Sequence, residues 1–312
     1  MKMSKYNIPE AAPAPDVLDP PPLARPASEG GDDAPPERTL GEIIRDTRNL
    51  SAEQVEKILE YQQAKGLRFG EAAIALGFVN ADDVLTALAQ QFNYPYASPE
   101  RREISPELVA LNAPFTPQAE AFRGLRSQIV MRTAVEGETR RAIAVISPNH
   151  KDGKTYIAAN LAVVLAQLGG RTLLVDADLR GPRQHAVFGL NGAAGLSRIL
   201  LGRTGSSVIQ QIESVPNLYV LPAGAPPPNP LELLERPAFA MLMREMAGKF
   251  DHVVIDTPAA EYGSDAAVIA VRCGSALVVA RNQHSRLDAL QALTGSLSGS
   301  AAKIVGVVTN EH

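Results

Sequence analysis

The chain is poor in cysteine and in long apolar runs, and each shortage excludes a class of protein. Cys273 is the single cysteine among 312 residues, which rules out a disulfide framework or a cysteine-ligated metal site and suits a reducing cytoplasm. No run approaches the roughly 18–20 apolar residues of a membrane-spanning helix, and the amino terminus lacks the apolar segment of a secretory signal. A formal net charge of -4 does not indicate a nucleic-acid partner. We therefore expect a soluble, intracellular protein that reaches a membrane only through a partner.

Residues 1–38 have the composition of a segment that does not fold by itself. Prolines crowd there, while apolar residues are few and scattered. Such a segment cannot bury enough apolar surface to offset the conformational entropy lost on ordering. We predict a disordered tail.

Residues 39–97 contain an internal repeat with an offset of 29 residues. Gly41 recurs as Gly70, for example, and Val55 as Val84. Each half has the pattern of a short helix, a turn and a longer helix. The repeat therefore predicts a small all-helical module.

The longer helix of each half begins with a capping signal. Ser51 and Asn80 stand where N-caps belong, and three residues later Gln54 and Asp83 can complete a capping box. Apolar residues at helical spacing along these two helices predict one shared core. They are Val55, Ile58, Leu59, Val84, Leu85 and Leu88.

The module resembles the N-terminal domain of type II secretion and pilus ATPases. Some members of that group bind cyclic di-GMP through tandem repeats of the Arg-Leu-Gly type. The second repeat, residues 68–91, follows the pattern, whereas the first has Thr39 in place of the arginine and Arg48 in place of a glycine. The resemblance implies cyclic di-GMP as one candidate ligand, and the alternative is a protein-docking or purely structural module.

From residue 105 to residue 312, apolar strands alternate with helical patterns. The strands are apolar along their whole length, which is typical of a parallel sheet covered by helices on both faces. We predict an α/β fold for this domain. The predicted strands are residues 142–147, 172–175, 218–221, 252–255, 276–280 and 304–309.

A phosphate-binding signature follows the first predicted strand. Gly153, Lys154 and Thr155 stand where that strand meets a helix. Backbone N–H groups and the helix N-terminus would surround a phosphate there, the lysine would neutralise it, and the threonine hydroxyl would bind Mg²⁺. The first glycine of the usual P-loop pattern is replaced by Pro148. Taken alone, the signature is therefore of moderate specificity.

Carboxylates at the ends of two other predicted strands strengthen it. Asp176 and Asp178 follow the second strand, and Asp256 follows the fourth. Strand carboxyl ends form the edge at which open α/β sheets bind ligands, and an acidic residue after an apolar strand holds Mg²⁺ in P-loop enzymes. Three carboxylates and a P-loop at one edge predict a nucleotide site.

With these segments in view, the domain resembles the bacterial tyrosine kinases of exopolysaccharide synthesis, which belong with the MinD and ParA ATPases to one P-loop group. The segment 176–180, Asp-Ala-Asp-Leu-Arg, is similar to the second Walker motif of that family. The segment 120–126 is similar to its E-x-x-R-x-x-R motif, which serves self-association through Glu120, Arg123 and Arg126. Without the family context, an intrahelical salt-bridge stripe would explain these charges equally well.

The resemblance implies roles for the site residues. Lys154 and the loop amides would hold the phosphates of ATP, Thr155, Asp178 and Asp256 would hold Mg²⁺, and Asp176 or Asp178 would orient or deprotonate a tyrosine hydroxyl. Phosphoryl transfer needs mainly positioning and charge neutralisation, so a small set suffices. The residues expected at ATP are Lys151, Asp152, Gly153, Lys154, Thr155, Tyr156 and Asn310.

Joined to the helical module, the domain resembles the chain-length-determinant-associated subgroup of these kinases. That resemblance implies a homo-oligomer, and a cytoplasmic protein held at the inner membrane by an integral-membrane polysaccharide co-polymerase. Two departures stand out. His150 and Lys151 replace the usual Pro-Gly, and a non-glycine at position 151 costs about 1 kcal/mol if φ is positive there. The seven tyrosines form no carboxyl-terminal cluster, so an acceptor tyrosine must be internal or on a partner.

Two other functions fit the same motifs. A partitioning-type ATPase switch is one, although Asn149 stands where those proteins carry their signature lysine. The other is a nucleotide-dependent scaffold without kinase activity, which the altered loop and the missing tyrosine cluster favour. Phosphorylation of tyrosine distinguishes a kinase from both.

Overall fold

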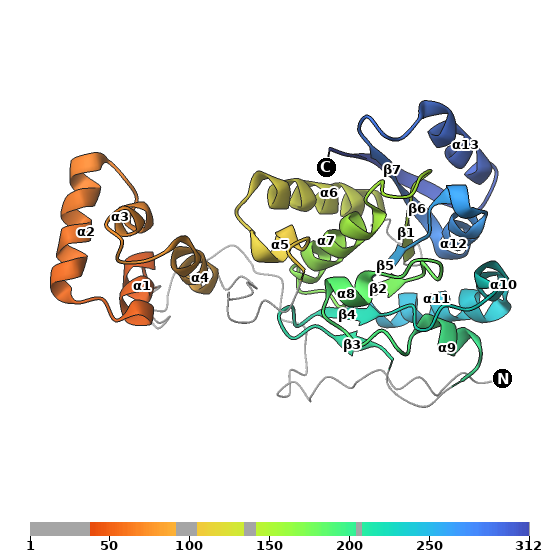
Figure 1. The fold of residues 1–312 in the computed structure, drawn as a ribbon, viewed down its shortest axis with the longest axis horizontal. Helices are drawn as coiled ribbons and strands as arrows, with labels where there is room; N and C mark the ends of the chain where they lie inside the picture. Colours follow the sequence, from red (N-terminus) through yellow and green to blue (C-terminus); the bar gives the residue numbers. More distant parts are fainter. Residues whose placement is uncertain (1–37, 92–104, 134–141, 204–207, 312) are drawn as a thin grey trace, which may run out of the picture. The chain divides into compact units, whose positions relative to one another are not determined.

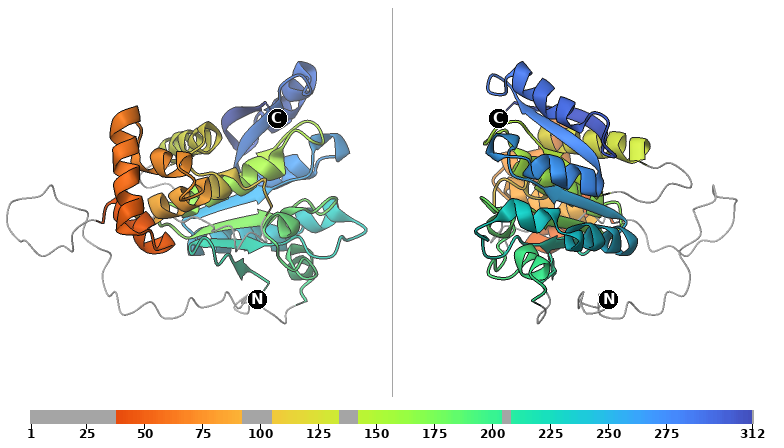
Figure 2. Two further views of the ribbon diagram at one scale, coloured as in Figure 1. Left: turned by 60° about the vertical axis from the view of Figure 1, so that its left-hand side comes forward. Right: turned by 90° about the vertical axis from the view of Figure 1, so that its right-hand side faces the viewer.

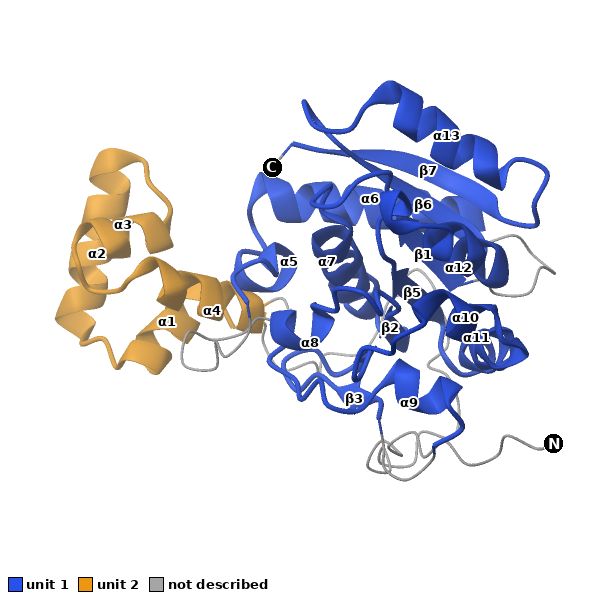
Figure 3. Ribbon diagram, turned by 45° about the vertical axis from the view of Figure 1, so that its right-hand side comes forward, with its two compact units in different colours: residues 1–9, 101–312 blue, residues 10–100 orange. Residues whose placement is uncertain are grey.

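A computed structural model of the chain describes residues 38–91, 105–133, 142–203 and 208–311. These residues form two compact units, one up to residue 91 and one from residue 105 onward (Figures 1 and 3). The predicted disordered tail, apart from Arg38, and residues 92–97 of the predicted module lie outside the described residues. Within these ranges no helix is both long and apolar enough to cross a membrane.

The first unit is the predicted repeat of two helix pairs. The equivalent helices of the two halves begin 29 residues apart, at residues 40 and 69 and at residues 52 and 81. The Ser51–Gln54 capping box is present, and Asn80 and Asp83 exchange the corresponding backbone hydrogen bonds of 2.9 and 2.8 Å. The helices are α1 (Leu40–Arg48), α2 (Ala52–Lys65), α3 (Phe69–Ala75) and α4 (Ala81–Gln91).

The core of this unit lies partly elsewhere than predicted. Ile58 of α2 is fully buried, but Leu59 is 46 % exposed, because one residue along a helix turns the side chain by about 100° away from the core. The predicted core contained residues of the two longer helices only, but the short helices also supply buried core residues. They are Ile43 and Ile44 of α1 and Ala72 and Ala73 of α3. The prediction that Leu59 belongs to the shared core is therefore wrong.

The second unit is built on a seven-stranded sheet with the strand order β3-β4-β2-β5-β1-β6-β7. All six predicted strands are present and parallel, and a two-residue strand, β3, adds an antiparallel edge that the sequence did not predict. The strands are β1 (Ala142–Ile146), β2 (Thr172–Asp176), β3 (Gln210–Gln211), β4 (Leu218–Leu221), β5 (His252–Asp256), β6 (Gly274–Arg281) and β7 (Lys303–Asn310).

Helices cover both faces of this sheet (Figures 1 and 2). The crossovers from β1 to β2 and from β5 to β6 run in opposite directions along the sheet, so right-handed connections put their helices on opposite faces. Helices α5 and α6 pack with α7, whereas α10, α11 and α13 pack with α12. The helices are α5 (Val109–Asn112), α6 (Pro117–Thr133), α7 (Lys154–Ala166), α8 (Gln184–Val187), α9 (Leu196–Leu200), α10 (Pro230–Glu235), α11 (Pro237–Lys249), α12 (Asp265–Cys273) and α13 (Leu287–Leu297), with a 3₁₀ turn η2 (Ala260–Tyr262).

The strand register fixes the site. Asp256 at the end of β5 lies opposite Asp176 of β2 on one side and Val145 of β1 on the other. The carboxyl ends of these three central strands therefore meet, together with the loop that follows β1. The predicted P-loop and the predicted carboxylates lie at one edge of the sheet.

Candidate active site

The loop between β1 and α7 has the geometry of an anion-binding P-loop. Lys151 and Gly153 both have positive φ, 64° and 97°, and the helix begins at Lys154. Left-handed residues alternating with right-handed ones turn successive backbone N–H groups toward one point, which forms a nest for an anion. The N-terminus of α7 adds positive potential at that point.

Lys154 folds back across this loop. Its Nζ donates hydrogen bonds to the Ser147 hydroxyl at 2.9 Å and to the Asn149 carbonyl at 3.3 Å. The side chain is buried, and burial lowers the pKa of the ammonium from its ordinary value, while the nearby carboxylates of Asp256 and Asp178 oppose that shift. The Lys154 ammonium therefore lies within the loop that would bind an anion.

The loop is held in place by the segment after β6. The fully buried Asp152 carboxylate accepts hydrogen bonds from the Asn149 amide at 2.8 Å and from the Ser285 hydroxyl at 2.8 Å. Nδ1 of His284 is 2.9 Å from Oδ1 of Asp152, the same oxygen that accepts the hydrogen bond from Ser285. The Asp152 side chain thus faces inward and stabilises the loop, so the contact with ATP that the sequence predicts for this residue would have to come from its backbone amide.

Two further side chains hold the loop from the same edge. Arg281 donates to the Lys151 carbonyl at 3.1 Å, and the Asn310 amide donates to the Asp152 carbonyl at 3.0 Å. Arg281, His284 and Ser285 were not predicted as site residues. The signal that could have found them is their position at the end of β6 or within four residues after it, where the carboxyl end of the strand faces the P-loop.

Lys151 has a positive φ, so the condition stated for the altered motif is met and a non-glycine residue occupies the left-handed region. A Cβ in this conformation costs about 1 kcal/mol. We expect Lys151→Gly to raise the melting temperature by about 2–4 °C, the shift that corresponds to 1 kcal/mol in a domain of this size. Lys151→Ala keeps the Cβ and removes the charge, so it should give no such gain in the same thermal scan. Equal gains from both variants would mean that charge, and not backbone strain, governs stability here.

Asp256 is the carboxylate that best suits a cation. It is fully buried; its Oδ2 accepts a 2.9 Å hydrogen bond from Gln184 Nε2, while its Oδ1 has no hydrogen-bond partner. The Oε1 of Gln184 also lacks a partner, and Gln184 Nε2 reaches the Thr155 carbonyl at 3.1 Å. Oxygens left without a donor beside the P-loop threonine fit hydrated Mg²⁺, an ion that prefers oxygen ligands and keeps several waters. In the described ranges no group of three His, Cys, Asp or Glu side chains could hold a metal by itself, so phosphate oxygens and Thr155 would have to complete such a site.

The protonation of Asp256 makes a prediction about pH. Burial raises the pKa of this carboxyl to about 6, with Asp178 adding to the rise and Thr155 and Lys154 opposing it. Because the pKa is higher in the fold than in the unfolded chain, this group contributes its full stability below about pH 4, and the contribution is lost as the pH rises through about 6. Asp256→Asn has no such loss. In the absence of Mg²⁺ and nucleotide, the free energy of unfolding of Asp256→Asn minus that of wild type should therefore be roughly 1–3 kcal/mol larger at pH 7 than at pH 4.

Urea unfolding in EDTA at both pH values measures this difference. Asp288→Asn is a suitable control, because Asp288 is exposed and its pKa is lowered by its hydrogen bond with Arg286. Its pH trend should be small and of opposite sign. A flat difference between wild type and Asp256→Asn would show that Asp256 is ionised throughout this range in the fold.

The two carboxylates at the end of β2, Asp176 and Asp178, differ in surroundings. Asp176 is fully buried, and its oxygens accept from the backbone amides of Asp178 at 3.2 Å, Arg183 at 3.1 Å and Gln184 at 2.9 Å. Burial, followed by the charge of Asp256, raises the pKa of Asp176 well above its ordinary value. Asp178 is partly exposed, and only its Oδ1 is engaged, by the amides of Arg180 and Gly181. Asp178 is thus the carboxylate open to a substrate.

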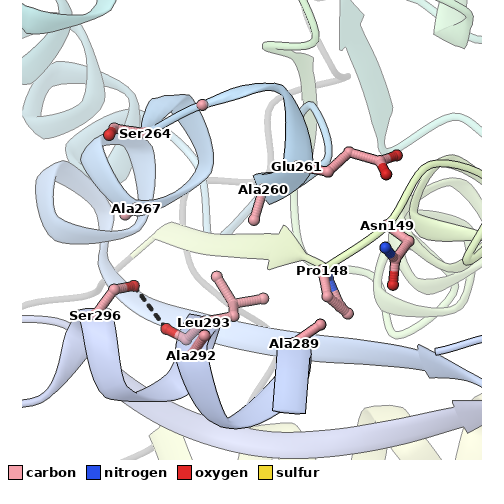
Figure 4. A pocket seen from close by; sticks show the side chains of 11 residues that line it. Pro148, Asn149, Ala260, Glu261, Ser264, Ala267, Ala289, Ala292, Leu293 and Ser296 are labelled. Carbon is pink, nitrogen blue, oxygen red and sulfur yellow. Dashed lines mark hydrogen bonds between the residues drawn. The ribbon is translucent and has the colours of Figure 1, made fainter. Parts of the chain in front are cut away.

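Two hollows border the loop. One, of ≈ 380 Å³, lies between the start of the P-loop, η2, α12 and α13, and is lined mainly by small apolar side chains such as Ala267 and Ala292 (Figure 4). The other, of ≈ 350 Å³, is lined by Tyr156 and Asn310 together with Phe122 and Val308. The two sequence-predicted residues Tyr156 and Asn310 are therefore neighbours at one apolar hollow beside the P-loop.

The predicted self-association residues lie on α6. Arg123 pairs with Glu120 at 2.8 Å and also donates to the Pro114 carbonyl, and Arg126 donates to the Val164 carbonyl at 3.0 Å. Glu120 is 72 % exposed in its side chain. Both arginines are engaged within the chain, so self-association through this face remains a prediction.

The second unit matches known proteins closely. Residues 143–312 match the family described as the CobQ/CobB/MinD/ParA nucleotide binding domain. The chain is 32 % identical over 204 residues to the tyrosine-protein kinase YwqD of Bacillus subtilis strain 168, which covers 65 % of this chain and 85 % of that protein. The kinase domain of the Escherichia coli tyrosine kinase ETK is similar in structure, with a TM-score of 0.61 at 31 % identity, covering 67 % of this chain and 81 % of that one.

Other relatives are much longer. The tyrosine-protein kinase wzc of Salmonella typhimurium is 31 % identical over 204 residues, and the match covers 65 % of this chain but 28 % of that protein. The resemblance to wzc therefore concerns one part of a larger molecule. Together with the P-loop, the strand-end carboxylates and the sheet that brings them together, these matches identify the chain as a member of the bacterial tyrosine-protein kinases, within the CobQ/CobB/MinD/ParA nucleotide-binding family.

Proposed function

We propose that the chain transfers the γ-phosphoryl group of ATP to tyrosine hydroxyls in a reaction that requires Mg²⁺. The observation that carries this proposal is the geometry at Lys154, whose ammonium is held in the P-loop beside the unpartnered Oδ1 of Asp256 and the open carboxylate of Asp178. One side of this arrangement suits phosphate oxygens and the other suits a cation and an incoming hydroxyl. Phosphoryl transfer needs these three functions in one place.

The P-loop would bind the phosphates. The backbone amides from Lys151 to Thr155 and the N-terminus of α7 surround the phosphates, and Lys154 neutralises charge between the β- and γ-phosphates. The Thr155 hydroxyl, Asp256 and Asp178 would hold Mg²⁺, which neutralises the charge that develops on the phosphate oxygens. The base would occupy the apolar hollow beside Tyr156 and Asn310.

Asp178 would orient the acceptor tyrosine and take its proton. Its Oδ1 is fixed by two backbone amides, so the carboxylate is held at the rim of the site. Asp176, by contrast, uses both oxygens to fold the segment that carries Asp178 and Gln184. We therefore assign Asp176 a positioning role. The ≈ 380 Å³ hollow beside the start of the P-loop leaves room for an approaching side chain.

We propose exopolysaccharide synthesis as the setting. The sequence resembles chain-length-determinant-associated kinases, which implies a homo-oligomer that uses Glu120, Arg123 and Arg126 and an integral-membrane co-polymerase that recruits the chain to the inner membrane. The exposed carboxylate of Glu120 supports such a contact. The helical module would then serve as a docking or ligand-binding element of the assembly, with cyclic di-GMP as a candidate ligand.

The test is phosphotyrosine formation by the purified chain with ATP and Mg²⁺, measured on the chain itself and on a synthetic copolymer of glutamate and tyrosine. We expect signal in wild type and none in Lys154→Met or Asp178→Asn, both of which should still fold. Adding the cytoplasmic segment of the co-polymerase controls for a missing activator. Bound ATP with no phosphotyrosine on either substrate, even with that segment present, would leave the nucleotide-dependent scaffold as the function.

A further inference from the structure

Tyr262 lies beside the P-loop with an accessible ring. It ends the 3₁₀ turn η2, it is 47 % exposed, and its ring centroid is 5.8 Å from that of His150 in the loop. The backbone just before it is tied to the same loop, because the amides of Ala260 and Glu261 each donate a 3.0 Å hydrogen bond, to the carbonyls of Ser147 and Pro148. The position of Tyr262 is therefore fixed relative to the loop.

This side of the loop is the γ-phosphate end. The Lys154 ammonium donates hydrogen bonds to the Ser147 hydroxyl and the Asn149 carbonyl. In P-loop proteins this lysine pairs with the β- and γ-phosphates. Residues 147–150 thus border the place where the terminal phosphate would lie. Tyr262 contacts the last of these residues, His150. The Tyr262 ring is therefore a neighbour of the loop residues that would border the transferred group.

The same segment also contacts the loop that carries Asp178, the carboxylate that would take the proton. Three residues after Tyr262, Asp265 holds Arg180 through two hydrogen bonds of 3.1 and 3.0 Å, and Arg180 follows Asp178 by two residues. Between them, Gly263 has φ 142°, a conformation that side chains rarely adopt, and bends the chain directly after the tyrosine. A short turn therefore carries Tyr262 between the phosphate loop and the loop of Asp178.

The other described tyrosines are placed differently. Tyr219 is 3 % exposed, inside the sheet core. Tyr156 packs edge-on against Phe122 at 5.5 Å, and burial, followed by the charge of Glu107, raises the pKa of its hydroxyl. Tyr61 lies in the separate helical unit. Among the tyrosines that the structure describes in the kinase unit, Tyr262 is the one with an exposed ring.

We propose that Tyr262 accepts the phosphoryl group of ATP bound at its own P-loop. The proposal rests on the proposed kinase function. The Tyr262 Oη forms a bond to the γ-phosphorus, the bond between that phosphorus and the oxygen bridging to ADP breaks, and the hydroxyl proton passes to Asp178. The products are ADP and phosphotyrosine, and no other reactant is needed.

Peptide mapping of the full chain tests this directly. Trypsin releases residues 250–272 as one peptide in which Tyr262 is the only tyrosine, and residues 58–65 as one that contains Tyr61. After incubation with ATP and Mg²⁺, we expect phosphate on Tyr262 in the first peptide and none in the second. The Tyr262→Phe variant should lose most of the phosphotyrosine signal of the chain, whereas Tyr61→Phe should retain it.

A mixture of wild type with tagged Lys154→Met chain tests transfer within one chain. The tagged chain should stay unmodified at Tyr262, and label on it would overturn the same-chain step. If the glutamate–tyrosine copolymer is phosphorylated while Tyr262 is not, the proposal fails and the kinase function stands. If neither is phosphorylated even with the cytoplasmic segment of the co-polymerase present, the kinase function fails and the proposal fails with it.

Discussion

Replacing Gly153 by alanine is expected to weaken nucleotide binding about 10- to 100-fold, which corresponds to one or two lost hydrogen bonds. A Cβ at this position would lie 2.2 Å from Nδ2 of Asn310, far inside van der Waals contact. Asn310 is itself buried, and that same Nδ2 donates to the Asp152 carbonyl. The methyl group must therefore displace the amide that holds the loop, and the backbone must also keep φ 97° with a side chain present.

Gly169→Ala is the matched control for this experiment. Gly169 has φ 93°, almost the same conformation, but a Cβ there meets nothing within 4 Å. Both variants should lose about 1 kcal/mol from the left-handed backbone, and Gly153→Ala alone should lose ADP affinity in calorimetric titration. If Gly169→Ala impairs binding to the same degree, the contact with Asn310 does not shape the site.

Replacing Lys154 by methionine is expected to lower the rate of phosphoryl transfer by at least about 100- to 1,000-fold, the usual cost of removing one group that stabilises transition-state charge. The side chain is buried, and its ammonium is the cation that the structure places inside the loop. Methionine has a similar length and no charge, so the phosphates lose their neutralising partner while the packing is largely kept.

The fold should survive this change. Burial lowers the pKa of the ammonium, which means that the fold holds the charge at a cost, and an apolar side chain removes that cost. We expect a melting temperature within a few degrees of wild type and no stabilisation by added ATP. Lys249→Met is the control, since Lys249 forms only a helix-surface pair with Glu245. Undiminished transfer by Lys154→Met would remove Lys154 from the mechanism.

Much of the fold could be predicted because its signals are local. Each strand of the parallel sheet is a short apolar run bounded by polar residues, proline or glycine, so β1 and β5 are found within one residue of their predicted bounds. The helices of the small module could also be predicted, because the 29-residue repeat gives the same helix pattern for both halves. Strand β3 was missed because two glutamines, Gln210 and Gln211, carry no apolar signal.

The site was harder to predict, because it depends on which side chains are buried. Asp176 and Asp178 are indistinguishable in the sequence, yet one is enclosed by three backbone amides and the other is open. The inward turn of Asp152 onto His284 depends on a contact across 132 positions of sequence. No local pattern carries such information, and it appears only once the sheet order is known.

That long contact also bears on how the protein is made. The P-loop emerges from synthesis before His284, Ser285 and Asn310, although its shape depends on contacts with these three residues, which follow Asp152 by more than 130 positions. Contacts of such high sequence separation form late in folding, because loop-closure entropy must be overcome first. Binding competence is thus acquired only after β6 and β7 have been made, and a chain cut before β6 would carry an intact motif with no loop to hold a phosphate.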